Sequence, residues 1–307
     1  MDKNIAQIDK STDFCPIWQC TKWDVNKQGG TAIGEAVCNV TGGCKTKPSS
    51  PQRSAAIQPE TLEVTIMDER LRKVIDESEN IVFFGGAGVS TESNIPDFRS
   101  ESGLYHAQQK YGYSPETMLS HSFYREHAKE FFTYYRENLL YPDAQPNQAH
   151  LTLAKLEKMG KLKAVVTQNI DGLHQKAGSK KVYELHGSVL RNYCEKCGAF
   201  HDMDYMLNEA NCKDGIPRCS CGGVMKPDVV LYEEMLDDDC INGAVAAISA
   251  ADTLIIGGTS LVVYPAAGLI NYFRGKNLVL INKSETPYDG RADLVIYDSI
   301  GKVMAWE

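Results

Sequence analysis

Four cysteines in the second half of the chain have the spacing of a metal site. Cys194 and Cys197 are separated by two residues and Cys219 and Cys221 by one, with glycine directly after each pair. Thiolates from two such pairs can surround a zinc ion tetrahedrally, and a closed four-thiolate site is structural rather than catalytic. Four unrelated thiols are the alternative, and Cys212, between the pairs, could compete as a ligand. The spacing predicts one structural Zn²⁺ per chain at the two pairs.

A glycine-rich turn after an apolar run predicts a phosphate-binding loop. Residues 81–84 are Ile-Val-Phe-Phe, typical of a buried parallel strand, and residues 85–88 are Gly-Gly-Ala-Gly. Glycine lets the backbone turn tightly and approach a ligand, and residues 89–91 could open a helix whose free N–H groups would face a pyrophosphate. Because the spacing is not Gly-x-Gly-x-x-Gly, a turn without a ligand is the alternative.

Polar residues or glycines follow three other expected strands. The segments concerned are 168–171, His186–Gly187 and 257–260. In a doubly wound parallel sheet the carboxyl ends of the strands meet at one edge, where such folds bind their ligands. His186 on its own is more typical of a structural histidine, but its position among these loops makes it a candidate general base.

Strands that alternate with helices must position these residues. Apolar periodicity predicts an α/β fold with a doubly wound parallel, Rossmann-like sheet. Helices are expected over 68–78 (with Asp68 as N-cap), 114–140, 147–159, 240–250 and 265–274, and strands over 81–84, 163–167, 182–185, 253–256, 277–281 and 294–297. The aromatic residues of 114–140 are more typical of a core than of a ligand site.

Residues 1–66 differ from the rest of the chain in composition and in apolar periodicity. Their apolar periodicity is poor, and residues 47–51 read as a linker. They contain Cys15, Cys20, Cys38 and Cys44, for which a second metal site or nested disulfides are alternatives. Composition favours a weakly ordered extension of unknown role.

Charge and composition exclude several classes of function. The net charge of −8 argues against wholesale nucleic-acid binding, with a local basic patch as the alternative, and no specific nucleic acid is expected as a partner. No apolar run is long enough to span a bilayer, and the start of the chain is not typical of a secretory signal. We therefore expect a cytoplasmic protein without a membrane partner, whose ten cysteines serve as metal ligands before disulfides.

Taken together, the motifs resemble those of the sirtuins in order and spacing. The matching segments lie between about residues 68 and 300 and are Gly86–Ser90, Ile95–Arg99, Thr167–His174, His186–Gly187, the four zinc-type cysteines and Gly258–Ser260. Lys226–Glu234 and Asn282–Asp289 are similar to the bacterial NAD-dependent protein deacetylases. The resemblance implies a catalytic domain at 67–307, made of a Rossmann-like part (about 67–105, 147–188 and 227–307), a small helical part (about 106–146) and a zinc ribbon (about 189–226).

The resemblance also implies a reaction and its residues. The acetyl group of acetyl-lysine would pass to ADP-ribose from NAD, with release of nicotinamide and O-acetyl-ADP-ribose. His186 would act as general base on a ribose hydroxyl, with Asn169 and Asp171 as the other catalytic residues. The implied NAD-binding residues are Gly86, Ala87, Gly88, Thr91, Asp97, Phe98, Arg99, Gln168, Asn169, Ile170, Asp171, His186, Gly258, Thr259, Ser260, Asn282 and Ile300.

The substrate is expected to be an acetylated protein or peptide. Val229, Val230 and Leu231 form an extended run that suits pairing with a peptide by strand addition. Sirtuins that remove acidic acyl groups carry a Tyr-x-x-Arg pair where this chain has Phe132 and Tyr135, so acetyl groups are favoured. The competing functions are an ADP-ribosyltransferase or NAD hydrolase on the same scaffold, and a non-catalytic NAD sensor.

Overall fold

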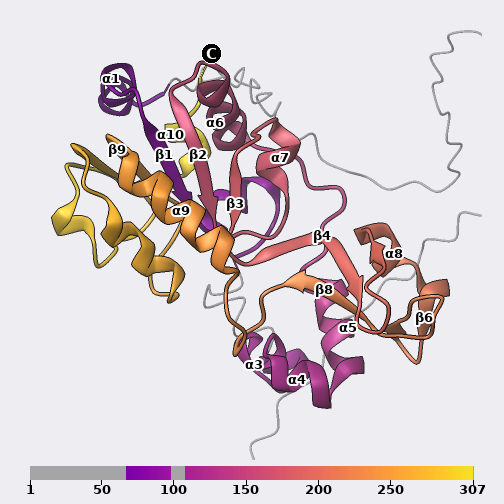
Figure 1. Cartoon of the computed structure of the whole chain (residues 1–307). Coiled ribbons are helices and arrows are strands. Elements are labelled where there is room, and N and C mark those ends of the chain that lie inside the picture. Colours follow the sequence, from indigo (N-terminus) through magenta and orange to yellow (C-terminus); the bar gives the residue numbers. More distant parts are fainter. Residues whose placement is uncertain (1–66, 98–107, 307) are drawn as a thin grey trace, which may run out of the picture. The chain divides into compact units, whose positions relative to one another are not determined.

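A six-stranded parallel sheet forms the centre of the described structure. The structure is a computed structural model that describes residues 67–97 and 108–306 (Figure 1). The strand order is β11-β10-β9-β1-β2-β3, and every pairing is parallel. The strands are β1 (Ile81–Gly85), β2 (Leu162–Thr167), β3 (Val182–Glu184), β9 (Thr253–Gly257), β10 (Asn277–Ile281) and β11 (Leu294–Ile296). Because the order reverses between β1 and β9, the predicted doubly wound sheet is confirmed.

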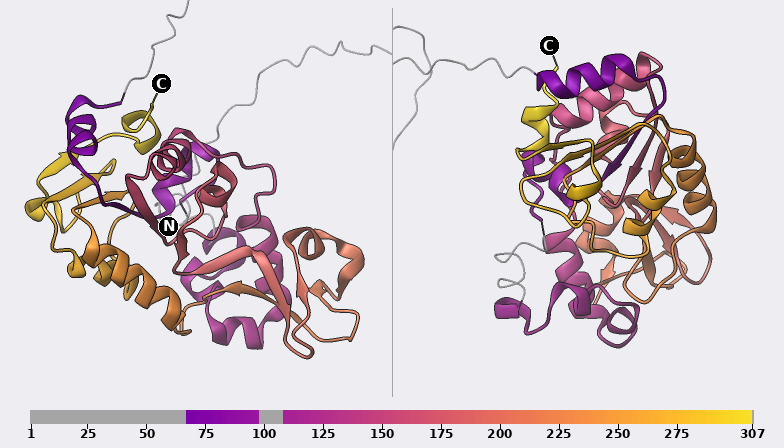
Figure 2. Two further views of the ribbon diagram at one scale, coloured as in Figure 1. Left: turned by 45° about the horizontal axis from the view of Figure 1, so that its top comes forward. Right: turned by 90° about the vertical axis from the view of Figure 1, so that its left-hand side faces the viewer.

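Alternating side chains of the strands build one hydrophobic core on each face of this sheet. In β1, Phe83 belongs to the first core and Phe84 to the second. Helices cover both faces (Figures 1 and 2). The first core contains residues of α1 (Glu69–Glu77), α6 (Gln148–Lys158) and α10 (Ile300–Val303), and the second those of α9 (Asp238–Ala250) and the 3-10 helix η4 (Ala266–Tyr272).

A third core joins the small helical part to an antiparallel ribbon. The buried aromatic residues of α4 and α5 pack with Val189 and Met225 of the ribbon, which confirms that the aromatic stripe is structural. The helices here are α3 (Pro115–Met118), α4 (His121–Glu126) and α5 (Ala128–Asn138). The ribbon consists of β4 (Gly187–Cys194), β5 (Phe200–His201) and β8 (Met225–Val229), with α8 (Met203–Leu207), η3 (Glu209–Asn211), β6 (Cys212–Lys213) and β7 (Ile216–Pro217) between them.

Capping residues set several element ends where the sequence predicts them. The Asp68 carboxylate accepts hydrogen bonds from Arg70 N and Leu71 N at the start of α1. Asn147 caps α6 in the same way, and β10 has the predicted bounds. Among the described residues no helix is long and apolar enough to cross a membrane.

Three expected helices differ in the structure. Residues 89–91 do not open an α-helix: two 3-10 turns, η1 (Ala87–Val89) and η2 (Thr91–Ser93), end at Asn94, which has a left-handed φ of 63°. The stretch 114–140 contains three helices rather than one, because Ser120 caps the start of α4 and the non-helical backbone of His127 separates α4 from α5. The helix expected over 265–274 is the 3-10 helix η4, in which Gly268 N donates to Pro265 O. Two further short elements are α7 (Leu173–Ala177) and η5 (Asp289–Arg291).

Candidate active site

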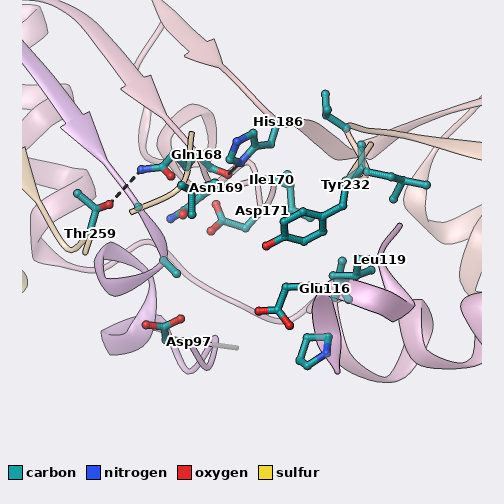
Figure 3. Close-up of a pocket in the computed structure, with 18 of the residues that line it drawn as sticks. Asp97, Glu116, Leu119, Gln168, Asn169, Ile170, Asp171, His186, Tyr232 and Thr259 are labelled. Atoms are coloured by element: carbon teal, nitrogen blue, oxygen red, sulfur yellow. Dashed lines mark hydrogen bonds between the residues drawn. The ribbon is translucent and has the colours of Figure 1, made fainter. Parts of the chain in front are cut away.

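A cavity of about 290 Å³ lies where the carboxyl ends of the central strands meet the small helical part (Figure 3). Most of the residues expected to bind NAD, to catalyse or to hold the substrate line it. These are Gly86, Ala87, Asp97, Gln168, Asn169, Ile170, Asp171, His186, Val229, Val230, Leu231, Gly258, Thr259 and Ser260. Segments separated by more than a hundred residues of sequence therefore contribute to one site.

The loops after β1 and β9 are packed directly against each other through glycine. Gly88 N donates to Gly258 O at 2.8 Å, and a Cβ atom on Gly88 would lie 2.8 Å from Gly258 Cα. Gly258 itself has a φ of 58°, which favours glycine. The two loops can approach this closely only without side chains, and the contact places Gly86, Ala87 and Gly258 in the lining of the cavity.

Gln168 connects the loop after β2 to its neighbours. Gln168 N donates to Gly85 O at 3.0 Å, and its side-chain Nε2 donates to Thr259 Oγ1 at 3.1 Å (Figure 3). The ends of β1, β2 and β9 are thus held together by one residue.

Ser90 links the two predicted catalytic residues of this loop. Its hydroxyl donates to Asp171 Oδ2 at 2.7 Å and accepts from Asn169 Nδ2 at 3.0 Å. Leu173 N donates to the other Asp171 oxygen at 2.8 Å. Burial raises the pKa of the Asp171 carboxyl, and the hydrogen bonds from Leu173 and Ser90 oppose that rise. Sequence reasoning did not include Ser90 among the site residues, although it lies within the glycine-loop motif and lines the cavity.

The imidazole of His186 has a defined tautomer. Its Nδ1 lies 3.0 Å from the backbone carbonyl oxygen of Gln168 (Figure 3). A carbonyl oxygen can only accept, so Nδ1 carries the proton and Nε2 of the neutral ring can take one up. This is the arrangement that a general base requires.

The expected substrate segment is joined to His186 through the backbone. Val229 pairs with Gly187 at the end of β8, and Val230 N donates to His186 O at 3.0 Å. Only Val229 of the predicted extended run belongs to a regular strand. The segment and the candidate base are therefore fixed relative to each other.

Some predicted site residues do not line the cavity. Gly88 packs on Gly258, and Ile300 is buried in the first core. Thr91 Oγ1 donates to Gly88 O, and Asn282 Nδ2 donates to Ser284 O. Phe98 and Arg99 lie outside the described residues.

The cavity also has lining residues that sequence reasoning missed. They are Glu116 and Leu119 of the small helical part, which Figure 3 shows across from Asp97, and Tyr232 of the chain after β8. Phe132 and Tyr135, expected near the acyl group, are fully buried in the third core and are not among the lining residues. No short motif marks these contacts, because they depend on how α3 packs against the sheet.

The four predicted zinc ligands are brought together at the far end of the ribbon. Their Sγ atoms all lie within 4.8 Å of one another, with Cys194 and Cys221 at 3.4 Å and Cys197 and Cys219 at 3.7 Å. Sulfurs bound tetrahedrally to zinc at about 2.3 Å lie about 3.8 Å apart, so the donor set fits this ion. Cys212 is not in this cluster: its Sγ accepts from Arg136 Nη1.

Comparison with known proteins identifies the family. The Sir2 family profile matches residues 86–265. The NAD-dependent protein deacetylases of Clostridium acetobutylicum and Clostridium perfringens are 64% and 65% identical to this chain, over 76% of its length and 95% and 96% of theirs. Solved Sir2 structures are also similar. One with a p53 peptide and NAD⁺ has a TM-score of 0.68 at 38% identity, and covers 77% of this chain and 95% of its own. Another, with a deacetylated p53 peptide and 3'-O-acetyl-ADP-ribose, has a TM-score of 0.70 at 37% identity, and covers 78% and 96%. The chain belongs to the Sir2 family.

Proposed function

We propose that this protein is an NAD-dependent protein-lysine deacetylase. It transfers the acetyl group of acetyl-lysine to ADP-ribose and releases nicotinamide and O-acetyl-ADP-ribose. The observation that carries this proposal is that His186 is hydrogen-bonded both to the loop after β2 and to the substrate segment. Its side chain is bonded to the loop after β2, and its backbone carbonyl is bonded to Val230 of the substrate segment.

The residues around the cavity suit NAD. NAD would supply a ribose carbon that the acetyl oxygen can attack as nicotinamide leaves. The side-chain-free contact between the loops after β1 and β9 lets backbone groups approach a pyrophosphate. Gln168 offers its amide to a ribose, and the Ser90 network holds Asn169 and Asp171 in place beside it.

His186 acts as the general base. The Gln168 carbonyl keeps the proton on Nδ1, so that Nε2 is the atom that accepts a proton from a ribose hydroxyl. Asn169 and Asp171 line the same cavity and are oriented by Ser90. The three proposed catalytic residues therefore lie together in the cavity.

The acetylated peptide pairs with the backbone of Val229, Val230 and Leu231. Main-chain pairing gives affinity without reading side chains, so selectivity for the flanking sequence is expected to be loose. Zn²⁺ is held by Cys194, Cys197, Cys219 and Cys221 and stabilises the ribbon from which β8 leads to this segment. The metal has no part in the reaction.

Residues 67–307 are proposed as the catalytic domain, with residues 1–66 as an extension of unknown role. The cytoplasm is the proposed location, because its reducing conditions keep zinc-binding thiolates available. Neither a specific nucleic acid nor a membrane is a proposed partner, in keeping with the net charge of −8.

Mass spectrometry of the products formed from NAD and an acetylated peptide tests the proposal. We expect deacetylated peptide, nicotinamide and O-acetyl-ADP-ribose in equal amounts. Nicotinamide release without the peptide would instead support an NAD hydrolase, and a peptide carrying ADP-ribose would support an ADP-ribosyltransferase. No turnover of either compound would support an NAD sensor.

A further inference from the structure

We propose that Glu233 is a positioning residue for the peptide substrate: its carboxylate fixes the substrate segment to α4. The inference rests on the proposed function and adds how the peptide-pairing edge is held in place. Glu233 lies two residues after the substrate segment Val229–Leu231 and lines the same cavity.

The backbone of Glu233 is in a conformation that its side chain disfavours. Its φ is +76°, in the left-handed region where a Cβ atom crowds the backbone. Such a conformation persists only when the surrounding contacts hold it, and it is concentrated at functional sites. Glycine would adopt it without strain.

Among the described residues, the hydrogen bonds that the Glu233 carboxylate accepts come from one residue of α4. Glu233 Oε2 accepts from Ser122 N at 2.9 Å, and Oε1 accepts from Ser122 Oγ at 2.8 Å. Ser122 is in the first turn of α4, where backbone N–H groups lack partners within the helix. Both carboxylate oxygens are therefore used to join the segment to the helix.

The residues on either side of Glu233 make further hydrogen bonds, to the small helical part and within the segment itself. Tyr232 N donates to Leu119 O at 3.0 Å, and His121 N donates to Tyr232 O at 2.9 Å. Glu234 Oε2 accepts from Leu231 N at 2.9 Å, and Glu234 also pairs with His121 and with Lys226.

The substrate segment is thus fixed at both of its ends. At one end Val230 N is bonded to His186 O, and at the other Glu233 is bonded to Ser122. A peptide that adds to this segment finds its pairing edge already ordered, which lowers the entropy cost of binding. Glu233 makes no hydrogen bond to the Gln168 or Ser90 networks among the described residues, so its loss should weaken peptide binding and leave NAD binding and turnover in place.

Steady-state kinetics of the full-length, zinc-loaded protein with an acetylated peptide test this role. For Glu233→Ala we expect the KM for the peptide to rise about fivefold to tenfold, with kcat and the KM for NAD unchanged within about twofold. Glu233→Gln should stay near wild type, because its amide oxygen can accept from Ser122 N while its NH₂ donates to Ser122 Oγ. Glu126→Ala, an exposed residue at the other end of α4, is the matched control and should change nothing.

Glu233→Gly separates positioning from a merely structural role. Glycine relieves the backbone strain, so a residue that mattered only for folding would keep the wild-type KM when replaced by glycine. Positioning predicts that the KM for the peptide rises as it does for Glu233→Ala. Ser122→Ala adds an independent check, since the double variant Ser122→Ala with Glu233→Ala should be no weaker than Glu233→Ala alone.

An unchanged peptide KM in Glu233→Gly would overturn the proposal, as would an equal rise in Glu126→Ala or a loss confined to kcat. If Glu233→Ala fails to fold, Glu233→Gly and Ser122→Ala carry the test. Failure of the wild-type protein to deacetylate any peptide would overturn the proposed function instead, so the two failures are distinguishable.

Discussion

The imidazole rings of His150 and His174 lie 4.7 Å apart between centroids, where α6 packs on α7. Their exposed fractions are 0% and 1%. Among the described residues, Nε2 of His150 and both ring nitrogens of His174 have no hydrogen-bond partner. Burial lowers the pKa of His150 to about 4, and burial followed by the charge of His150 lowers that of His174. Both rings are therefore neutral in the folded protein.

This pair predicts acid-sensitive stability. The unfolded chain binds protons to these histidines below about pH 6.5 while the folded chain does not, so stability is lost as the pH falls from about 6.5 towards 4. For His150 the shift corresponds to at most about 3 kcal/mol. His150→Gln should reduce the loss and keep an acceptor for Asn147 N, which His150 Nδ1 now provides. Urea unfolding at about pH 7 and pH 5 measures this.

The exposed His127 is the control for that experiment. His127→Gln should lose as much stability between the two pH values as the wild type. An equal loss in His150→Gln would mean that the buried ring is not the source of the acid sensitivity.

His186→Ala should reduce NAD-dependent deacetylation to less than about a tenth of the wild-type turnover, since general-base catalysis contributes at least about a hundredfold. The fold and NAD binding should remain, because the hydrogen bonds of Gln168 to Gly85 O and Thr259 Oγ1 do not involve this ring. Turnover and calorimetric NAD titration measure the two effects. A variant that keeps more than about a tenth of the turnover would remove His186 from the base role.

Cys219→Ser should lower the zinc content by about one ion per chain, with lower activity as the ribbon loosens. Cys212→Ser is the matched control, because its thiol lies outside the cluster and contacts Arg136. Metal analysis of the two full-length variants compares them directly. Equal zinc in both would contradict the assignment.

Acetyl-lysine peptides should exceed succinyl-lysine peptides by roughly a hundredfold or more in kcat/KM, because an unpaired carboxylate is costly to desolvate. The described residues that line the cavity include Asp97 and Glu116 and no lysine or arginine. Arg136, the nearest cation to the Phe132–Tyr135 pair in sequence, donates instead to Gly215 O and Cys212 Sγ. Arg136→Gln should therefore leave the ratio unchanged. Similar kcat/KM values for the two peptides would show that a cationic side chain pairs with the succinyl carboxylate in the site.

The sequence predicts the sheet and the zinc ligands well because their signals are local. Apolar runs such as 277–281 fix a strand, and two cysteine pairs fix a donor set. The 3-10 turns after β1 are not predictable in this way, because left-handed Asn94 ends them within one turn. Glu116, Tyr232 and Glu233 were missed as site residues because they reach the cavity only through the packing of α3 and α4 against the chain after β8.

Gly187 and Val229 are partners in one ladder, so the chain enters the zinc ribbon and leaves it at the same place. A Cβ atom on Gly187 would lie 2.0 Å from Asp228 O, so entrance and exit touch. The ribbon is therefore an insertion whose two ends are adjacent. Insertions at the outer end of the ribbon, between Cys197 and Cys219, would lengthen the ribbon and leave the separation of His186 from Val230 unchanged. Modules of different size could be spliced into this position while the reacting groups keep their geometry.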